Sequence, residues 1–227
     1  MQEHDVDTAM HLAVGGEFSA FGLLERECLK YAGLKQDDYL IDVGCGSGRL
    51  AIPLSQYLKG QHLGTDVVPE LLDYARTQIR NPSWRFESVN GLYIPEQDGV
   101  ADMVCFFSVF THLMHEQIYL YLQEAKRVLK PGGRIVFSFL DFAVDNHWSI
   151  FEHTVQQASG DSPLNVFISK DAIDAWSKHL GLRIELIKDG GIPFFPLPST
   201  VTFDHGGRME TMGELGQSVC VLVKSGT

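Results

Sequence analysis

The residues best suited to hold a ligand form a glycine-rich segment in the first quarter of the chain. Residues 40–48 read Leu-Ile-Asp-Val-Gly-Cys-Gly-Ser-Gly, so an apolar run passes directly into a loop with three glycines. Glycine has no Cβ, which lets a bulky ligand approach the backbone closely. In a parallel sheet, ligands bind beyond the carboxyl ends of the strands, where such a loop lies. The segment therefore predicts a cofactor-binding loop.

The spacing of the glycines separates the competing cofactor classes. Dinucleotide enzymes need a small residue at the third fingerprint position, and counting from Gly44 and Gly46 that position is Arg49. The third glycine is Gly48 instead, and no Gly-Lys-Ser/Thr follows, so a phosphate-binding P-loop is also disfavoured. Asp66, which ends the next apolar run, can accept hydrogen bonds from both ribose hydroxyls. Its alternative role is to cap the helix that follows.

The elements that would position these residues alternate along the chain. We expect a helix over 19–31 and another that begins near Ser47 or Arg49, contains Pro53 and continues through Tyr57 and Leu58. One further helix begins at Pro69, and another covers 116–129. Lys130-Pro131-Gly132-Gly133 then ends the second of these helices and turns the chain. Strands are predicted at 39–43, 62–66, 84–89, 101–107 and 134–140.

The last third of the chain follows this rhythm less closely. We expect a helix over 147–159, a second one capped by Ser169, and strands at 182–188 and 218–224. Residues 190–216 read as a long functional or mobile loop. Repeated strand–helix alternation predicts an α/β fold with a mainly parallel sheet and helices on both faces.

Composition limits the function classes. The chain has 227 residues and a formal net charge of −11. This charge disfavours nucleic-acid partners and binding to anionic membranes. No apolar stretch approaches the roughly 20 residues that span a bilayer, and the acidic start of the sequence is not a signal peptide. Four cysteines without a CxxC pair are typical of free buried thiols in a reducing cytosol, so we expect a cytoplasmic protein.

The region from Asp38 to Leu140 resembles the class I (Rossmann-like) S-adenosylmethionine-dependent methyltransferases of the small-molecule type. Five motifs in the same order as in that family carry the resemblance. They are the glycine loop and the segments His62–Asp66, Phe86–Pro95, Ala101–Leu113 and Glu124–Val136. The resemblance implies a mostly parallel seven-stranded sheet whose seventh strand is antiparallel. It also implies S-adenosylmethionine as cofactor and S-adenosylhomocysteine as product.

The resemblance also implies roles for residues of the loop and the second strand. Gly44 and Gly46, with Cys45 between them, would approach the methionine and adenosine parts of the cofactor. Asp42 would order the loop or meet the amino group of the methionine part. Asp66 would hold the ribose, and Val67 would lie beside the adenine.

Two further pairs of residues receive roles from the resemblance. Many family members have an aspartate five residues before the proline of the third motif, where this chain has Asn90. Its carbonyl can still accept the adenine N–H, without charge assistance, and the backbone N–H of Gly91 offers a second contact. Phe107 and Ser108 would lie beside the reacting methyl group.

Methyl transfer from a sulfonium is an in-line displacement, so the protein mainly aligns the nucleophile and, for a hydroxyl, removes its proton. His112, four residues past Ser108, is the best candidate base because histidine titrates near neutral pH. His115 is a second candidate. For both, the alternative is a histidine that only orders the loop.

Other candidate groups are weaker. His4, His11 and Glu17 belong to an N-terminal segment that often forms a lid in such enzymes, and each can equally be a surface residue. The remaining histidines considered lack metal-ligand spacing, so we predict no metal. They are His147, His153, His179 and His205.

The residues of this chain do not identify the acceptor. The segment Cys105-Phe106-Phe107-Ser108 lacks the Asn/Asp-Pro-Pro-Tyr run of amino-directed nucleic-acid methyltransferases. We therefore expect transfer to an oxygen or nitrogen of a small molecule, by a monomer or homodimer. The apolar segment 191–198 could line the substrate pocket, cross the surface or form a dimer contact. The alternatives are a nucleotide-dependent oxidoreductase and a non-catalytic module that binds the cofactor.

Residues 1–227 are expected to form one methyltransferase domain. Within it, 1–37 would be a helical lid and 38–140 the cofactor-binding core. Residues 141–227 would supply substrate-side helices, the late loop and the closing strands.

Overall fold

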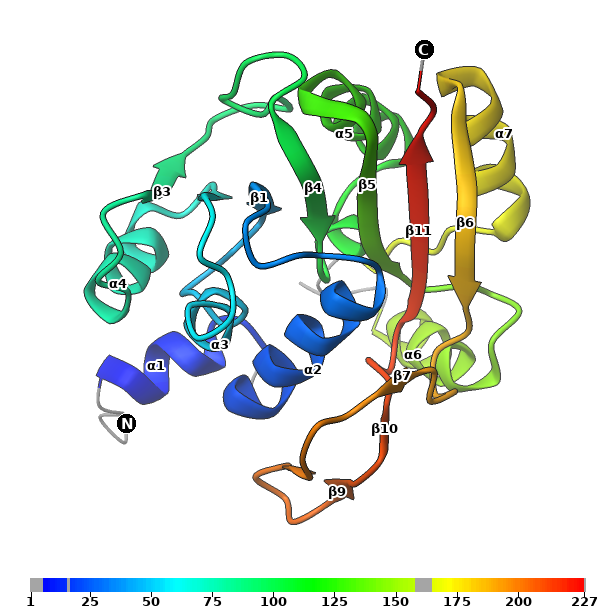
Figure 1. Cartoon of the computed structure of the whole chain (residues 1–227). Helices are drawn as coiled ribbons and strands as arrows, with labels where there is room; N and C mark the ends of the chain where they lie inside the picture. The colour runs from blue at the N-terminus through cyan, green and yellow to red at the C-terminus, as the bar shows by residue number, and fades with distance from the viewer. Residues whose placement is uncertain (1–5, 16, 158–164, 227) are drawn as a thin grey trace.

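A seven-stranded sheet organises the computed structural model, which describes residues 6–15, 17–157 and 165–226 (Figure 1). Its strand order is β3-β2-β1-β4-β5-β11-β6. All neighbours pair in parallel except β11, which is antiparallel to both β5 and β6. The predicted mostly parallel sheet with an antiparallel seventh strand is confirmed. The strands are β1 (Leu40–Val43), β2 (His62–Asp66), β3 (Trp84–Ser88), β4 (Ala101–Phe106), β5 (Leu129–Phe139), β6 (Leu182–Lys188) and β11 (Ser218–Lys224).

Helices cover both faces of the sheet, and Figure 1 shows α2 and α5 on opposite sides of it. One apolar core joins the sheet to α2, α3 and α4, and the other joins it to α5 and α7. β1 is buried along its whole length, and β4 at every residue except the half-buried Asp102, because both faces are covered. The helices are α1 (Val6–Leu12), α2 (Phe18–Tyr31), α3 (Ala51–Leu54), α4 (Pro69–Gln78), η1 (Phe110–His112), α5 (His115–Val128), α6 (Asp145–Gln156) and α7 (Lys170–Leu180).

Local signals in the sequence explain several boundaries. Pro69 occupies the first turn of α4, where a missing N–H costs nothing. The Ser169 side chain accepts a hydrogen bond from the Ala172 N–H and so caps α7, as predicted. Gly181 follows α7 with φ 63°, the left-handed conformation in which helices often end.

The helix after the glycine loop is shorter than its apolar spacing predicts. It covers only Ala51–Leu54, and the chain then continues in turns in which the N–H of Tyr57 donates to the carbonyl of Leu54. Pro53 lies in the first turn, where its missing N–H has no helical partner to lose. Leu58 is nevertheless buried, so the turns keep the apolar contacts that the spacing indicated.

The expected turn at Lys130–Gly133 is also different. β5 begins at Leu129, which pairs with Ala101, and the register shifts before Met103 pairs with Arg134. The Lys-Pro-Gly-Gly residues therefore form an irregularity inside the strand, with Gly132 at φ 79°. Such a bulge inserts extra residues into the strand while the strand keeps its direction.

The segment 190–216 is a folded ribbon, not the structureless loop that its glycines and prolines indicated. β7 (Phe195–Pro196) pairs with β10 (Met212–Gly213), and β8 (Val201–Thr202) pairs with β9 (Arg208–Met209). Phe194 meets Tyr31 edge-on, and Phe203 meets Phe21 in the same way. The ribbon therefore packs on α2, close to the carboxyl edge of the sheet (Figure 1).

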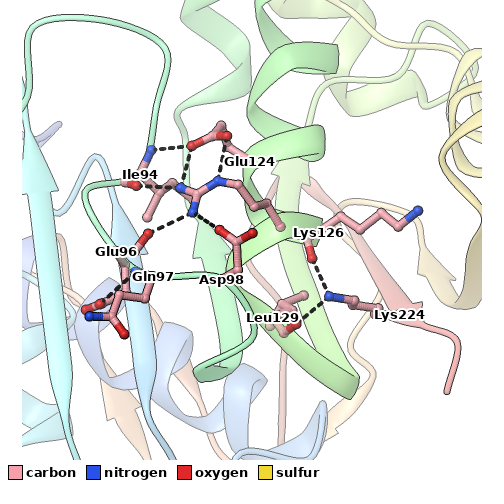
Figure 2. A network of polar contacts seen from close by, with 9 residues as sticks. Ile94, Glu96, Gln97, Asp98, Glu124, Lys126, Leu129 and Lys224 are labelled. Atoms are coloured by element: carbon pink, nitrogen blue, oxygen red, sulfur yellow. Dashed lines mark hydrogen bonds and ion pairs between the residues drawn. The ribbon is translucent and has the colours of Figure 1, made fainter. Parts of the chain in front are cut away.

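A polar network closes the opposite edge of the sheet (Figure 2). Arg127 of α5 bonds the carboxylates of Glu124 and Asp98 and the carbonyl oxygens of Ile94 and Glu96. Lys224, at the end of β11, donates to the carbonyl oxygens of Lys126 and Leu129 at 2.8 and 2.6 Å. These cations satisfy the last carbonyls of α5 and fix the connection between β3 and β4.

A substitution at Gly22 tests how closely α2 approaches the end of the glycine loop. A Cβ at this position would collide with the carbonyl oxygen of Arg49. We expect Gly22→Ala to lower the free energy of unfolding by about 1–3 kcal/mol, as overpacking does. In an unhindered helix the same change would stabilise by about 0.5–1 kcal/mol. Urea denaturation measures the difference, with Gly226→Ala, which meets open space, as the control. A Gly22→Ala protein at least as stable as the parent would contradict the close contact.

Candidate functional site

A cavity of about 1020 Å³ lies at the carboxyl ends of the parallel strands. The glycine loop, the end of β2 and the segment after β4 form three of its walls. Residues 12–15 and the residues just before β11 complete it. Of the predicted contacts, those that line the cavity are Gly44, Gly46, Asp66, Val67, Phe107, Ser108 and His112.

The glycine loop is a left-handed turn that only glycine forms readily. Gly44, Gly46 and Gly48 have φ values of 74°, 54° and 90°. A Cβ at Gly46 would lie 2.5 Å from Cγ1 of Val14, and one at Gly44 would collide with Val109. The loop therefore needs glycine twice over, once for its backbone angles and once for the side chains packed against it.

Asp66 braces this loop from the neighbouring strand. Its Oδ2 accepts the Gly46 N–H at 2.8 Å, and its Oδ1 accepts the Val68 N–H at 3.0 Å. The second bond supports the start of α4, so the capping role that competed with ligand binding is present. Each carboxylate oxygen has a further lone pair for a ligand hydroxyl. Asp66 and the exposed Val67 both line the cavity.

Asp42 lies beneath the loop and not in the cavity wall. Its Oδ1 accepts the Cys105 thiol at 3.5 Å, and its Oδ2 has no hydrogen-bond partner in the part of the chain that the structure describes. Nε2 of the buried His62 lies 4.0 Å from Oδ2. Burial raises the pKa of Asp42 to about 7, whereas burial lowers the pKa of His62 to about 3. Between these two pKa values both side chains are therefore neutral, and Asp42 and His62 do not form an ion pair.

Three other predicted contacts also lie outside the cavity lining. Cys45 is buried below the loop, with its sulfur 2.8 Å from the place where a Cβ on Gly64 would be. Asn90 and Gly91 are exposed, and their neighbour Val89 lines the cavity instead. The carbonyl of Gly91 accepts a hydrogen bond from the hydroxyl of Tyr121, which does line it.

A buried ion pair that the sequence analysis missed lies in the cavity wall. Arg49 donates to the Glu25 carboxylate at 2.5 Å and to the carbonyl oxygen of Val14 at 2.7 Å. Burial raises the pKa of Glu25, and the charge of Arg49 acts in the opposite direction. The available signal was a carboxylate on the apolar face of the 19–31 helix, where a charged residue needs a partner.

The segment after β4 brings a strained serine and a histidine to the cavity. Ser108 has φ 58°, and its N–H donates to Oγ of Ser138 at 2.8 Å. A non-glycine residue in this conformation is uncommon and often marks a functional site. His112 is exposed at the cavity wall. His115 does not line the cavity, because its Nε2 lies 3.0 Å from the carbonyl oxygen of Phe167 and its ring meets Trp176 edge-on.

The N-terminal segment covers the loop with different residues from those predicted. Leu12 to Gly15 line the cavity, while His11 stacks on Phe18 at 3.9 Å. The Glu17 carboxylate binds Nδ1 of His205 at 2.7 Å, away from the lining. His4 lies outside the described residues. In the described ranges, no group of three or more His, Cys, Asp or Glu residues could hold a metal ion.

Comparison with known proteins finds similarity to methyltransferases over the core of the chain. Residues 40–133 match the family described as "Methyltransferase domain". An uncharacterized methyltransferase of Schizosaccharomyces pombe is 34% identical over 47% of this chain and 41% of its own length. The demethylmenaquinone methyltransferase of Deinococcus radiodurans is 37% identical over 43% of this chain and 41% of its own length. The chain thus spans about two fifths of the length of these relatives.

Solved structures share the fold over most of the chain. A S-adenosylmethionine-dependent methyltransferase of Methanosarcina mazei has a TM-score of 0.65 at 15% identity and covers 88% of this chain and 98% of its own. The magnesium protoporphyrin IX methyltransferase of Synechocystis, solved with bound S-adenosylhomocysteine, has a TM-score of 0.64 at 14% identity. It covers 99% of this chain and 90% of its own. These likenesses show the Rossmann-like methyltransferase fold.

The buried carboxyl of Asp42 predicts a specific pH dependence of stability. Its pKa is about 7 in the folded protein and about 3.9 in an unfolded chain, so folding favours the protonated form. Its contribution to stability is therefore complete below about pH 4 and is lost as the pH rises to about 7. We expect the wild type to lose stability relative to Asp42→Asn over this interval, by at most about 1.4 kcal/mol per pH unit.

Urea denaturation at pH 4.5, 5.5, 6.5 and 7.5 measures this slope. His62 is present in both proteins, so its own titration cancels to first order in the difference. Asp73→Asn, which changes an exposed aspartate of α4, is the control and should show no such slope. A wild-type advantage that stays constant from pH 4.5 to 7.5 would show that Asp42 is ionised throughout.

Proposed function

We propose that this chain, which contains a class I S-adenosylmethionine-dependent methyltransferase domain, transfers the methyl group of that cofactor to an oxygen or nitrogen of a small-molecule acceptor. The observation that carries the proposal is the continuity of one cavity. It runs from the glycine loop and Asp66 to Phe107, Ser108 and His112. A cofactor bound at the loop would therefore share its space with an acceptor at the end of β4.

The chemistry of the lining fits the proposed cofactor. Asp66 can accept hydrogen bonds from ribose hydroxyls while it keeps its bonds to the loop. Glu25 and Arg49 offer a carboxylate and a guanidinium for the oppositely charged ends of the methionine part. The carboxylate of Asp66, which lines the cavity, also favours a cationic sulfonium. When bound, the cofactor supplies a methyl group that is already activated for displacement.

The protein's own part in the reaction is alignment, exclusion of water and proton removal. Phe107, Leu113 and Leu215 give the cavity apolar walls. His112 takes the proton of an acceptor hydroxyl as the oxygen forms its bond to the methyl carbon. The carbon–sulfur bond breaks at the same time and leaves S-adenosylhomocysteine. His115 acts only indirectly, since it fixes the segment at Phe167.

The acceptor we propose carries its hydroxyl or amine on an apolar, planar frame. The relatives include proteins named demethylmenaquinone methyltransferase and ubiquinone biosynthesis O-methyltransferase, whose names indicate ring-bearing substrates. The aromatic and aliphatic lining of the cavity supports the same class for this chain.

We further propose that the enzyme is cytoplasmic, acts as a monomer or homodimer, and has neither nucleic acid nor membrane as partner. The net charge of −11 disfavours nucleic acid and anionic membranes. Among the described residues, no helix combines the length and apolar character needed to cross a bilayer. We assign 1–37 to the lid, 38–140 to cofactor binding and 141–227 to the substrate side.

Cofactor binding is the first test. Calorimetric titration should show micromolar binding of S-adenosylmethionine and S-adenosylhomocysteine and none of NAD. Asp66→Ala should weaken both adenosyl compounds by about 1.5–3 kcal/mol, the range for hydrogen bonds to a charged group. Asp73→Ala on the exposed face of α4 is the matched control and should bind as the wild type does. Binding of NAD alone would refute the cofactor, and an unchanged Asp66→Ala affinity would refute the ribose contact.

His112→Ala separates catalysis from binding. We expect turnover to fall by about 10²–10⁴-fold, the usual contribution of a general base, with the affinity for S-adenosylhomocysteine unchanged. Turnover is followed as transfer of labelled methyl to a panel of phenols and hydroquinones. His179→Ala, in an exposed position on α7, is the control. Equal losses of turnover and cofactor affinity would mark His112 as a structural residue.

A further inference from the structure

One side chain in the cavity wall has a buried polar atom that no described residue bonds. Gln217 directly precedes β11, and its Nε2 donates to Oγ of Ser108 at 3.2 Å. Its Oε1 is buried and has no hydrogen-bond partner within the described part of the chain. Buried polar atoms are nearly always paired, so an acceptor oxygen left over in a cavity wall needs an explanation. Gln217 and Ser108 both line the cavity.

The position of Gln217 in the sheet separates it from the expected cofactor site. The strand order runs β1, β4, β5, β11, so Gln217 lies three strands away from the glycine loop that follows β1. Neighbouring strands are about 4.8 Å apart, which places β11 about 14 Å from β1. The carboxamide reaches back to Ser108 at the end of β4. It therefore faces the acceptor half of the cavity, next to the place where methyl transfer is proposed.

The backbone beside Gln217 is held in place by a buried histidine. Nδ1 of His147 accepts the Asp141 N–H at 2.9 Å, so this nitrogen carries no proton and the neutral ring carries it on Nε2. Nε2 then donates to the carbonyl oxygen of Gly216 at 2.9 Å. On the other side, Ser218 Oγ accepts the Gly190 N–H. The unpaired oxygen is thus presented by a fixed segment of backbone.

The partners of Gln217 are themselves fixed. The N–H of Ser108 is bonded to the buried hydroxyl of Ser138 on β5, and the carbonyl of Ser108 accepts the Thr111 hydroxyl at 3.0 Å. Three neighbouring strands, β4, β5 and β11, therefore contribute one row of polar groups to the cavity. Gln217 Oε1 is the member of this row that can only accept a hydrogen bond.

The geometry points to Gln217 as the residue that selects the acceptor, by receiving a hydrogen bond from its O–H or N–H group. This inference rests on the proposed function, because it names the acceptor half of the same site. A site built to bond a donor rejects the analogue without one, since its own buried group then stays unpaired. The acceptor class that follows is an apolar ring with a free hydroxyl or amine, which binds more tightly than its methyl ether.

Phenol and anisole are the probes, because they share one ring and differ in the O–H. Their dissociation constants are measured by ligand-observed NMR on the protein saturated with S-adenosylhomocysteine. We expect the wild type to bind phenol about 3- to 10-fold more tightly than anisole, as a single hydrogen bond implies. Gln217→Met keeps the length of the side chain and should abolish this preference. Gln123→Met, on the exposed side of α5, should retain it.

Two further measurements keep the outcome unambiguous. Gln217→Glu retains an accepting oxygen and should restore the preference for phenol, which a merely folding-defective site would not do. The affinity for S-adenosylhomocysteine should stay within about twofold in Gln217→Met, because Gln217 lies outside the cofactor half. Equal binding of the two probes by the wild type, binding of neither, or a preference that survives in Gln217→Met would overturn the inference.

Failure of the proposed function is recognised separately. If the wild type does not bind S-adenosylhomocysteine, the methyltransferase proposal fails. The comparison of phenol with anisole on the free protein then still decides the role of Gln217.

Discussion

The site depends on one backbone constraint, the left-handed turn of the glycine loop between β1 and α3. Three bonds from the adjacent strand hold this turn: Gly44 and Cys45 donate to the carbonyl oxygen of Thr65, and Gly46 donates to Asp66. Because the bonds come from β2, the loop is fixed to the sheet and not to its own short helix. Val14 and Val109 can then pack directly on the glycines and define the cavity from both sides. A side chain at either glycine would displace one of these walls.

Buried charge around this turn is arranged in two different ways. Glu25 is accompanied by Arg49, which also binds the carbonyl of Val14 and so links α2 to the N-terminal segment. Within the described ranges the Asp42 carboxyl has a hydrogen bond from the Cys105 thiol and no bonded cation, and burial raises its pKa. Burial raises the pKa of both carboxyls, and at Glu25 the charge of the bonded Arg49 opposes this rise. Glu25 and Arg49 line the cavity, whereas Asp42 lies in the support beneath the loop.

Much of the fold follows from local patterns in the sequence. Buried strands such as 101–107 and helix starts such as those at Pro69 and Ser169 depend on residues that are close together in the sequence. This is why the sheet and the helices could be predicted. The ribbon at 195–213 was not, because the pairing of β7 with β10 joins residues more than ten positions apart and the ribbon makes its aromatic contacts with the distant α2. The bulge at Lys130–Gly133 escaped for the same reason, since the pairing of Leu129 with Ala101 is set by β4. The spacing of apolar residues indicates which face of a helix or strand is buried, but it does not indicate which other element packs on that face.

The two halves of the cavity differ in the same respect. The groups of the proposed cofactor half, Gly44, Gly46 and Asp66, lie between the start of β1 and the end of β2, so their spacing in the sequence could indicate them. The acceptor half is assembled from Ser108, Ser138 and Gln217, more than a hundred residues apart at the extremes, which meet only because β11 inserts antiparallel between β5 and β6. No local pattern marks such residues. Variation in the residues around β11 can thus change the proposed acceptor half, while the glycine loop stays the same.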